Sequence, residues 1–439
     1  MVKRTARDIR RRNRFDALRC VYAAQAAVTR QDIAEATGLS FATVANLVAE
    51  LLEAEVLVEA GHEESGGGRP RARLAVNAER GALIGIDVAE TSIRLDLFDL
   101  ALRTLQSVDV PLPTRDERAA DGPRSEAPPA DIRPSDVVDG IVAGAEELLA
   151  AADTAPQQVL GTGVSVPGLV EREGGVSVYS PYWAWRDVPL RALLAERLDM
   201  PLYLDNPLKA STVGEMWFGA GREVEDLVVV TLRAGVGVGM AVGGALYRGT
   251  TNSAGEWGHT CLIPDGRECR CGNRGCVEAY ISTAGIAQTA RERATPGSRL
   301  LEAPDEETVV RNLGRAAAEG DPFATEVIAA TAGHLGVAVA NLVNLFNPEV
   351  LVLGGSTVDA LGEPLLKQTR DVIERHTLPQ TLRAVRLSLS TITVNPVSLG
   401  AATFGLEGFL NDRETFGPMT ANRRNARPSR TPETGRAPG

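Results

Sequence analysis

Residues 254–278 read AGEWGHTCLIPDGRECRCGNRGCVE, and this stretch says most about the fold. Three cysteines fall within eight positions of it, among glycines and charged residues. Such neighbours fit an apolar core poorly, and the spacing is typical of a metal site rather than of a disulfide framework. A histidine ten positions upstream completes a tetrahedral Cys₃His zinc set. The predicted ligands are His259, Cys269, Cys271 and Cys276.

Four protein ligands leave no open coordination position, so the predicted zinc is structural rather than catalytic. The chain has five cysteines, which leaves two outside this set. Cys261 lies near a ligand without matching the spacing, and we interpret it as a spare. Cys20 lies in an apolar helical segment, and we interpret it as a core residue.

Outward from this stretch, the hydrophobic pattern alternates between strands and helices. One cycle predicts strands at 82–88, 92–100, about 104–110 and 159–166, with a helix around 137–152. A second cycle predicts strands at 227–232, 235–244, 350–353 and 385–389, with helices near 322–346 and 361–375. Two similar α/β halves predict a two-lobed fold with a cleft between the lobes.

The length of 439 residues is too great for one hydrophobic core. We predict a basic arm at 1–14, a winged helix-turn-helix DNA-binding domain at 15–76 and the two-lobed domain at 80–411. Within the latter, residues 113–136 have the composition of a flexible loop, and residues 412–439 that of a disordered tail.

The net charge of −11 argues against a protein that coats nucleic acid, but its distribution matters more. Residues 1–19 hold eight basic and two acidic residues, which suits an end that touches phosphates, although a solvated tail would carry the same charge. No apolar run reaches the roughly 20 residues that cross a bilayer, and the basic start lacks a signal peptide's apolar core. We expect a cytoplasmic protein with no membrane partner.

Residues 29–44, TRQDIAEATGLSFATV, carry the helix-turn-helix signal. A first helix is expected after Thr29, a tight turn at Gly38 and a second helix capped by Ser40. The second helix has apolar residues at helical spacing, namely Val44, Leu47, Val48 and Leu51. Its opposite face is expected to meet base edges, and the strand-like 56–59 with the GGGRP segment is expected to form a wing. The predicted DNA-binding residues are Ser40, Ala42, Thr43, Asn46, Arg69 and Arg71. The periodicity alone also fits a small helical bundle for dimerisation, and the wing favours DNA.

These motifs resemble the ROK family (repressors, open reading frames and kinases), specifically its sugar-responsive repressors, over roughly residues 15–410. The 254–259 segment followed by Cys-x-Cys-Gly-x-x-Gly-Cys-Val-Glu looks like the family's sugar and zinc signature. The segments 166–170 and 352–355 resemble its sugar-side loop and its nucleotide-side turn. The resemblance implies an actin-like, hexokinase-like fold that holds a sugar between the lobes. It implies sugar-binding roles for Glu256, His259, Glu278, Asn206 and Gly168.

The resemblance breaks where phosphoryl transfer needs it most. The family's first phosphate loop, Asp-x-Gly-Gly-Thr, is here Asp87-Val88-Ala89-Glu90-Thr91, so both glycines are lost and Glu90 adds a like charge. The family's catalytic Asp position is occupied by Pro207. A shifted register would recruit Asp205, but the Gly214-Glu215 anchor downstream argues against it. The second phosphate motif at 232–239 is only partly glycine-rich. Lys209 changes the expected pocket floor and is able to pair with a sugar phosphate.

The leading hypothesis is therefore a sugar-responsive transcriptional repressor with a catalytically inactive, pseudokinase-type effector domain. Its expected partners are operator DNA, a sugar or sugar phosphate, and its own copies in a homodimer or homotetramer. The alternative is an ATP-dependent sugar kinase that carries a DNA-binding head. A third hypothesis is a ligand-independent DNA-binding scaffold whose body serves for oligomerisation.

Overall fold

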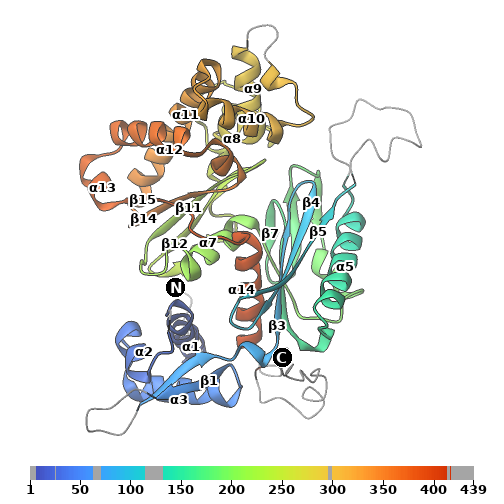
Figure 1. The fold of residues 1–439 in the computed structure, drawn as a ribbon, viewed down its shortest axis with the longest axis vertical. Coiled ribbons are helices and arrows are strands. Elements are labelled where there is room, and N and C mark those ends of the chain that lie inside the picture. Colours follow the sequence, from blue (N-terminus) through green and yellow to red (C-terminus); the bar gives the residue numbers. More distant parts are fainter. Residues whose placement is uncertain are drawn as a thin grey trace, which may run out of the picture.

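The computed structural model describes residues 6–24, 26–62, 71–113, 132–294, 299–412 and residue 416. It consists of a small N-terminal head and a body of two lobes (Figure 1). Arg69, most of the predicted flexible loop and most of the predicted disordered tail lie outside the described residues.

The head has three helices followed by a two-stranded antiparallel hairpin, which is the arrangement of a winged helix-turn-helix. The elements are α1 (Ala6–Ala23), α2 (Arg30–Thr37), α3 (Phe41–Glu53), β1 (Leu57–His62) and β2 (Ala72–Val76). Thr29 and Asp32 form a capping box at the start of α2, and Gly38 ends that helix at a φ of 67°. Ser40 caps α3 by accepting a hydrogen bond from the Thr43 amide. The predicted turn and the four predicted buried positions of α3 are confirmed.

Residues 6–14, predicted as part of a separate basic arm, are instead the first turns of α1. Their arginines contact the protein. Arg10 and Arg14 pair with Glu50 of α3, and Arg14 also donates to the Leu410 carbonyl oxygen at 2.8 Å. Part of the positive charge of this segment therefore binds the head to the body, through Arg14 and the Leu410 carbonyl oxygen.

Each lobe is built on a five-stranded sheet in which three antiparallel strands are extended by two parallel ones. The first sheet has the order β10-β6-β3-β4-β5, and the second has the order β13-β12-β11-β14-β15. The first comprises β3 (Ala82–Val88), β4 (Ser92–Asp99), β5 (Thr104–Pro111), β6 (Val159–Ser165) and β10 (Leu202–Asp205). The second comprises β11 (Leu227–Leu232), β12 (Val236–Val242), β13 (Ala245–Leu246), β14 (Val350–Gly354) and β15 (Arg386–Leu389). The two-lobed α/β prediction is confirmed, because the halves repeat one topology.

Helices cover the outer faces of both sheets (Figure 1). The first lobe carries α5 (Pro134–Ala151) and α6 (Leu190–Ala195). The second carries α8 (Glu278–Ile281), α9 (Thr283–Arg293), α10 (Glu306–Ala318), α11 (Pro322–Phe346), α12 (Ser356–His376) and α13 (Pro379–Ala384). A three-stranded meander, absent from the sequence prediction, follows β6 and consists of β7 (Leu169–Glu171), β8 (Val176–Ser180) and β9 (Trp185–Val188).

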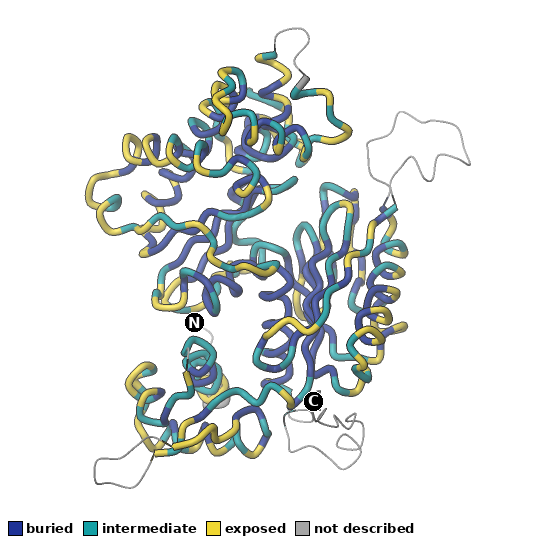
Figure 2. Tube along the Cα trace, in the orientation of Figure 1, coloured by how far each residue is buried: buried dark blue, intermediate teal, exposed yellow. Residues whose placement is uncertain are grey.

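Two further helices, α7 (Pro207–Phe218) and α14 (Pro396–Asn411), lie between the two sheets (Figure 1). The second of them crosses the first sheet so closely that side chains are excluded. A Cβ at Gly163 would lie 1.7 Å from the Ala401 carbonyl oxygen, and one at Gly85 would lie 1.9 Å from that of Ser398. Figure 2 shows the result, with the central strands of both sheets buried and most exposed residues on outer helices, turns and edge strands.

By length and composition alone, α11 is able to cross a membrane, and it is the one such helix among the described residues. In the structure it is a core helix of the second lobe, and 61% of its apolar window is buried.

Candidate functional site: a zinc-type loop beside an interlobe cavity

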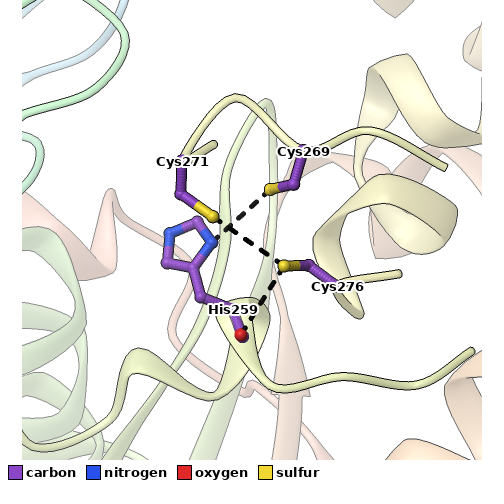
Figure 3. A group of neighbouring side chains, drawn as sticks. All are labelled: His259, Cys269, Cys271 and Cys276. Carbon is purple, nitrogen blue, oxygen red and sulfur yellow. Dashed lines mark hydrogen bonds between the residues drawn. The ribbon is translucent and has the colours of Figure 1, made fainter. Parts of the chain in front are cut away.

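The predicted metal ligands converge on one point of the second lobe (Figure 3). The ligand atoms of His259, Cys269, Cys271 and Cys276 all lie within 4.8 Å of one another. His259 ends the short 3₁₀ helix Glu256–His259, and the cysteines follow on the loop that leads into α8. Cys261 is exposed and outside this group.

The distances within this group fit a tetrahedral ion. Zinc bonds of about 2.3 Å to sulfur and about 2.05 Å to nitrogen place two sulfurs about 3.8 Å apart and a sulfur and a nitrogen about 3.6 Å apart. The Cys271 and Cys276 sulfurs are 3.8 Å apart, and the Cys269 sulfur lies 3.6 Å from Nδ1 of His259. The residues therefore fit zinc, and they would bind it through the Nδ1 atom of the imidazole, which leaves Nε2 for another partner.

Beside this group, the two lobes enclose a cavity of about 320 Å³. It collects all five residues that the family resemblance implies for sugar binding, which are Gly168, Asn206, Glu256, His259 and Glu278. Gly168 precedes β7 and Asn206 caps α7 on one side of the cavity. On the other side, Glu256 and His259 belong to the zinc-type loop, residues 256–277, and Glu278 begins α8. The cavity is large enough for a monosaccharide, and its polar groups converge from both lobes.

The two carboxylates that the family resemblance implies are held differently. Glu278 lies at the start of α8, where its Oε2 accepts a hydrogen bond from the Val236 amide at 3.0 Å. Glu256 makes no such bond to backbone among the described residues, and burial raises its pKa, although His259 and Lys209 act in the opposite direction. A half-buried carboxylate that lines a cavity is suited to accept hydrogen bonds from vicinal hydroxyls.

Asn206 and Gly168 hold each other in place. Asn206 is 1% exposed and caps α7 by accepting from the Lys209 amide at 3.0 Å. Its Nδ2 atom donates to the Gly168 carbonyl oxygen at 3.4 Å, and Gly168 has a φ of 97°. A side chain at Gly168 would also meet the Tyr179 carbonyl oxygen at 2.2 Å, so the loop requires glycine here.

Lys209 is not part of the cavity lining, contrary to the expectation that it lies on the pocket floor. It is fully buried, and its ammonium donates to the Ala254 carbonyl oxygen at 2.5 Å. Burial also lowers its pKa. The helical geometry of α7 turns this side chain toward the protein interior, so it is not placed to pair with a sugar phosphate.

Asp205 is buried as well, and it does not line the cavity. It pairs with Arg248 and accepts from Asn252 Nδ2 at 3.0 Å. Pro207 does line the cavity, at the first position of α7. The carboxylates among the described lining residues are therefore Glu90, Glu256 and Glu278.

The predicted DNA-reading positions lie on the outer side of the head. Ser40, Ala42 and Asn46 are exposed and Thr43 is half-buried, while Ser40 is engaged in the cap of α3. Arg71 is exposed before β2. Phe41, which the sequence prediction missed, is 54% exposed at the start of α3. Its spacing of three residues from Val44 matches that of the buried residues, so the sequence pattern gave no signal that Phe41 is exposed.

The sequence prediction also missed several lining residues of the cavity, which are Tyr179, Tyr182, Arg233, Arg270 and Asn273. Arg270 and Asn273 lie between the predicted zinc ligands, so their sequence position was a usable signal. The tyrosines lie on and just after β8 of the missed meander, and no local pattern points to them.

The sequence model of the ROK family matches residues 83–404, which is most of the two-lobed body. The xylose repressor of Caldicellulosiruptor bescii is 30% identical over 388 residues, which cover 88% of this chain and 93% of that protein.

Two solved structures place the fold. A ROK family transcriptional regulator described as a homologue of the E. coli MLC protein superposes with a TM-score of 0.73 at 23% identity, covering 92% of this chain and 97% of the other. A ROK family glucokinase from Streptomyces griseus, in complex with glucose and AMPPNP, has a TM-score of 0.62 at 28% identity and covers 74% of this chain and 98% of its own. The first similarity extends over the head as well as the body.

Proposed function

The chain belongs to the ROK family, and from this premise we propose that it is a cytoplasmic, sugar-responsive transcriptional repressor whose kinase-like body carries no kinase chemistry. One observation carries the proposal: a helix-turn-helix head and a cavity lined by the family's sugar-binding residue types occur in the same chain. The similarity to a xylose repressor over nearly the whole chain supports it.

The proposed effector is a neutral monosaccharide. Glu256 and Glu278 would accept hydrogen bonds from its hydroxyls, and His259 would contact it through Nε2. Glu90 adds a third carboxylate to the lining, and Lys209 is turned away. The two arginines among the described lining residues are already engaged, Arg233 with Asp87 and Arg270 with the Tyr182 ring, so neither is held free for a phosphate group. Zinc, held by His259 and the three cysteines, would fix the loop that supplies these contacts.

Loss of catalysis is part of the proposal. Proline at position 207 accepts no proton, and Asp205 is held by Arg248 outside the cavity. The alternative, a sugar kinase with a DNA-binding head, is favoured by the similarity to a glucokinase but lacks a carboxylate at the family's catalytic position.

For DNA binding, we propose that α3 enters the major groove with Ala42, Thr43 and Asn46 toward the bases. A homodimer or homotetramer would place two such helices in successive grooves. Arg71, and Arg69 outside the described residues, would contact phosphates or the minor groove.

Helix α7 is the proposed link between the two sites. Its first residues, Pro207 and Leu208, line the cavity, and its last turn carries Trp217. The Trp217 ring lies 4.7 Å from that of Phe15 and 5.4 Å from that of Tyr22, both on α1 of the head. A displacement of α7 by a bound sugar would therefore reach the head through packed rings.

The experiment is fluorescence anisotropy of the full chain on DNA from upstream of its own gene, with a salt series and a panel containing D-xylose, D-glucose and their phosphates. Tight binding that a neutral sugar weakens is the expected result. Binding that no sugar changes, together with no sugar-induced thermal shift, would favour the ligand-independent scaffold. No binding even at low salt, where phosphate contacts are strongest, would contradict the repressor proposal for this DNA.

A further inference from the structure

A partly buried ion pair joins the two lobes beside the cavity. Arg233 follows β11 of the second sheet, and Asp87 lies on β3 of the first (Figure 1). Nη1 of Arg233 lies 3.1 Å from Oδ2 of Asp87, although the residues are 146 positions apart. The Asp87 side chain is 2% exposed and that of Arg233 is 28% exposed. Water screens such a pair only weakly. Its loss would therefore destabilise the backbone turns on both sides of the cavity.

The surroundings of this pair are unusually charged. Asn395, before α14, also donates to Oδ2 of Asp87, at 3.0 Å. Glu90 lies close enough that its charge and that of Asp87 both raise the pKa of Arg233, with Asp87 the larger influence. Without the guanidinium, the negative charges of Asp87 and Glu90 would repel each other in a partly buried site. Arg233 therefore neutralises the first lobe's acidic turn with a charge from the second lobe.

The hydrogen bonding of the pair is incomplete. Among the described residues, Oδ1 of Asp87 is buried and has no hydrogen-bond partner. The Arg233 guanidinium makes one hydrogen bond in the described part of the chain, from Nη1. A carboxylate and a guanidinium are able to form two parallel bonds, so a small approach of the lobes would complete the pair.

A second arginine of the same lobe, Arg270, contacts the first-lobe side of the cavity. The Arg270 guanidinium lies 5.1 Å from the centre of the Tyr182 ring, over its face. Arg270 is on the zinc-type loop, and Tyr182 lies between β8 and β9 on the first-lobe side. Both residues line the cavity, so this contact and the ion pair flank the same space.

We propose that Arg233 is an interlobe latch, a positioning residue that holds the two walls of the cavity together by bridging to Asp87 and the Glu90 turn. The latch acts in the ligand-free chain. Its effect on sugar affinity rests on the proposed function, because a sugar bound by both lobes would benefit from walls already held at the binding distance.

The test compares hydrogen exchange of the ligand-free full chain with that of Arg233→Gln. We expect about tenfold faster exchange in both turns, residues 88–91 and 233–236, because one partner of a partly buried ion pair is removed. Arg233→Lys should retain part of the protection, since it keeps the charge but loses the planar fork. The double variant Asp87→Asn/Arg233→Gln should be more thermally stable than Arg233→Gln alone, because it removes the unpaired buried charge.

Arg94→Gln is the matched control. Arg94 pairs with Asp96 at 2.9 Å and with Asp109, but all three residues are on adjacent strands of the first sheet. Its loss should speed exchange in that sheet and leave residues 233–236 unchanged. Equal protection of both turns in Arg233→Gln and the parent chain would overturn the latch.

A second arm repeats the measurement with D-xylose and with D-glucose at saturating concentration. A sugar that protects the parent chain should bind Arg233→Gln about tenfold more weakly. Should neither sugar alter the parent chain, the effector part of the proposed function is in question, while the ligand-free comparison still decides the latch.

Discussion

At the residue scale, the four predicted zinc ligands are the most self-contained feature of the chain. Three of them lie within eight positions, and the structure brings their ligand atoms and that of His259 within 4.8 Å. The thiols carry no disulfide among the described residues. A group of this kind gains its stability from the ion that it holds.

Replacing Cys276 by serine should release the zinc and, with it, the sugar response. The reason is that Cys276 is 1% exposed at the base of the loop, and serine is a poor zinc ligand. Metal analysis of the purified protein should give about one zinc per chain for the parent, and clearly less for the variant. The control is Cys261→Ser, which changes an exposed cysteine outside the group. A parent chain purified without zinc, yet stable to a chelator, would contradict the assignment.

Glu215 offers a pH test at the same scale. It is 1% exposed on α7, one of its oxygens has no partner among the described residues, and burial raises its pKa. The folded state therefore holds the proton more strongly than the unfolded state, and stability falls as pH rises from the unfolded pKa of about 4.3 toward the higher folded value. Above that range the penalty is fully present.

Glu215→Gln removes this ionisation and keeps an oxygen for the Ala220 amide, which now donates to Glu215 at 2.9 Å. The variant should gain melting temperature over the parent at pH 8 and gain less at pH 5. Thermal melts at both pH values measure the difference. An equal gain at both would show that the carboxyl titrates alike in the folded and unfolded states.

At the scale of elements, α3 is the proposed reading helix, and its two kinds of contact are separable. Asn46→Ala should cost about 1–3 kcal/mol of operator binding and relax the preference at one base pair, because it removes an amide able to pair with a base edge. Arg71→Ala should weaken binding to all sequences and reduce the slope of log affinity against log salt by about 1. Anisotropy on matched operator and random DNA measures both. Equal loss on the two DNAs for Asn46→Ala would exclude a base contact.

The element α7 carries the proposed coupling. Trp217→Leu should leave the DNA affinity and the sugar affinity near their parental values, but the sugar-induced change in DNA affinity, about 5- to 150-fold for typical coupling, should fall toward onefold. The reason is that the rings of Phe15 and Tyr22 lose their contact with the end of α7. Anisotropy with and without sugar gives the ratio.

The matched control for this prediction is Trp185→Leu. Trp185 is also buried, but it lies in the core of the first lobe, and its indole donates to the Ile132 carbonyl oxygen. Both variants should lose stability, and only Trp217→Leu should lose the response. An intact response in Trp217→Leu would place the coupling outside α7.

At the scale of the whole molecule, one hydrophobic core runs from the head into the body. Leu18 and Val44 of the head belong to the same cluster as Trp217 and Phe409 between the lobes. Each lobe has a further core of its own. A head that shares its core with the lobe junction is suited to respond to what happens there.

Whether the two-lobed body catalyses phosphoryl transfer from ATP to a sugar is tested at the same scale. With Mg·ATP and either D-glucose or D-xylose, we expect no ADP release above the sugar-free background, because Pro207 occupies the family's catalytic Asp position and the first phosphate loop has lost both glycines. The assay is coupled ADP detection, with the Streptomyces griseus glucokinase as positive control. Sugar-dependent ADP release would establish the kinase alternative.

The sequence by itself predicted the features that depend on near neighbours. The zinc ligands, the capped turn between α2 and α3, and the strands of both sheets other than β10 and β13 follow from spacings of a few residues. Periodicity of 2 or 3.6 and clustered thiols are local properties, so they survive without knowledge of the rest of the chain.

Only the tertiary structure decided which distant residues meet. Lys209 was expected on the pocket floor and is buried beneath it, while Arg233 was part of a glycine-rich motif and proved to bridge the lobes. The meander β7–β9 and the helix α14 also escaped prediction, since short strands and glycine-rich helices carry weak periodic signals. The orientation of Lys209 on α7 and the pairing of Arg233 with Asp87, 146 residues apart, both depend on how the two sheets pack around the cavity. No local sequence pattern encodes that packing.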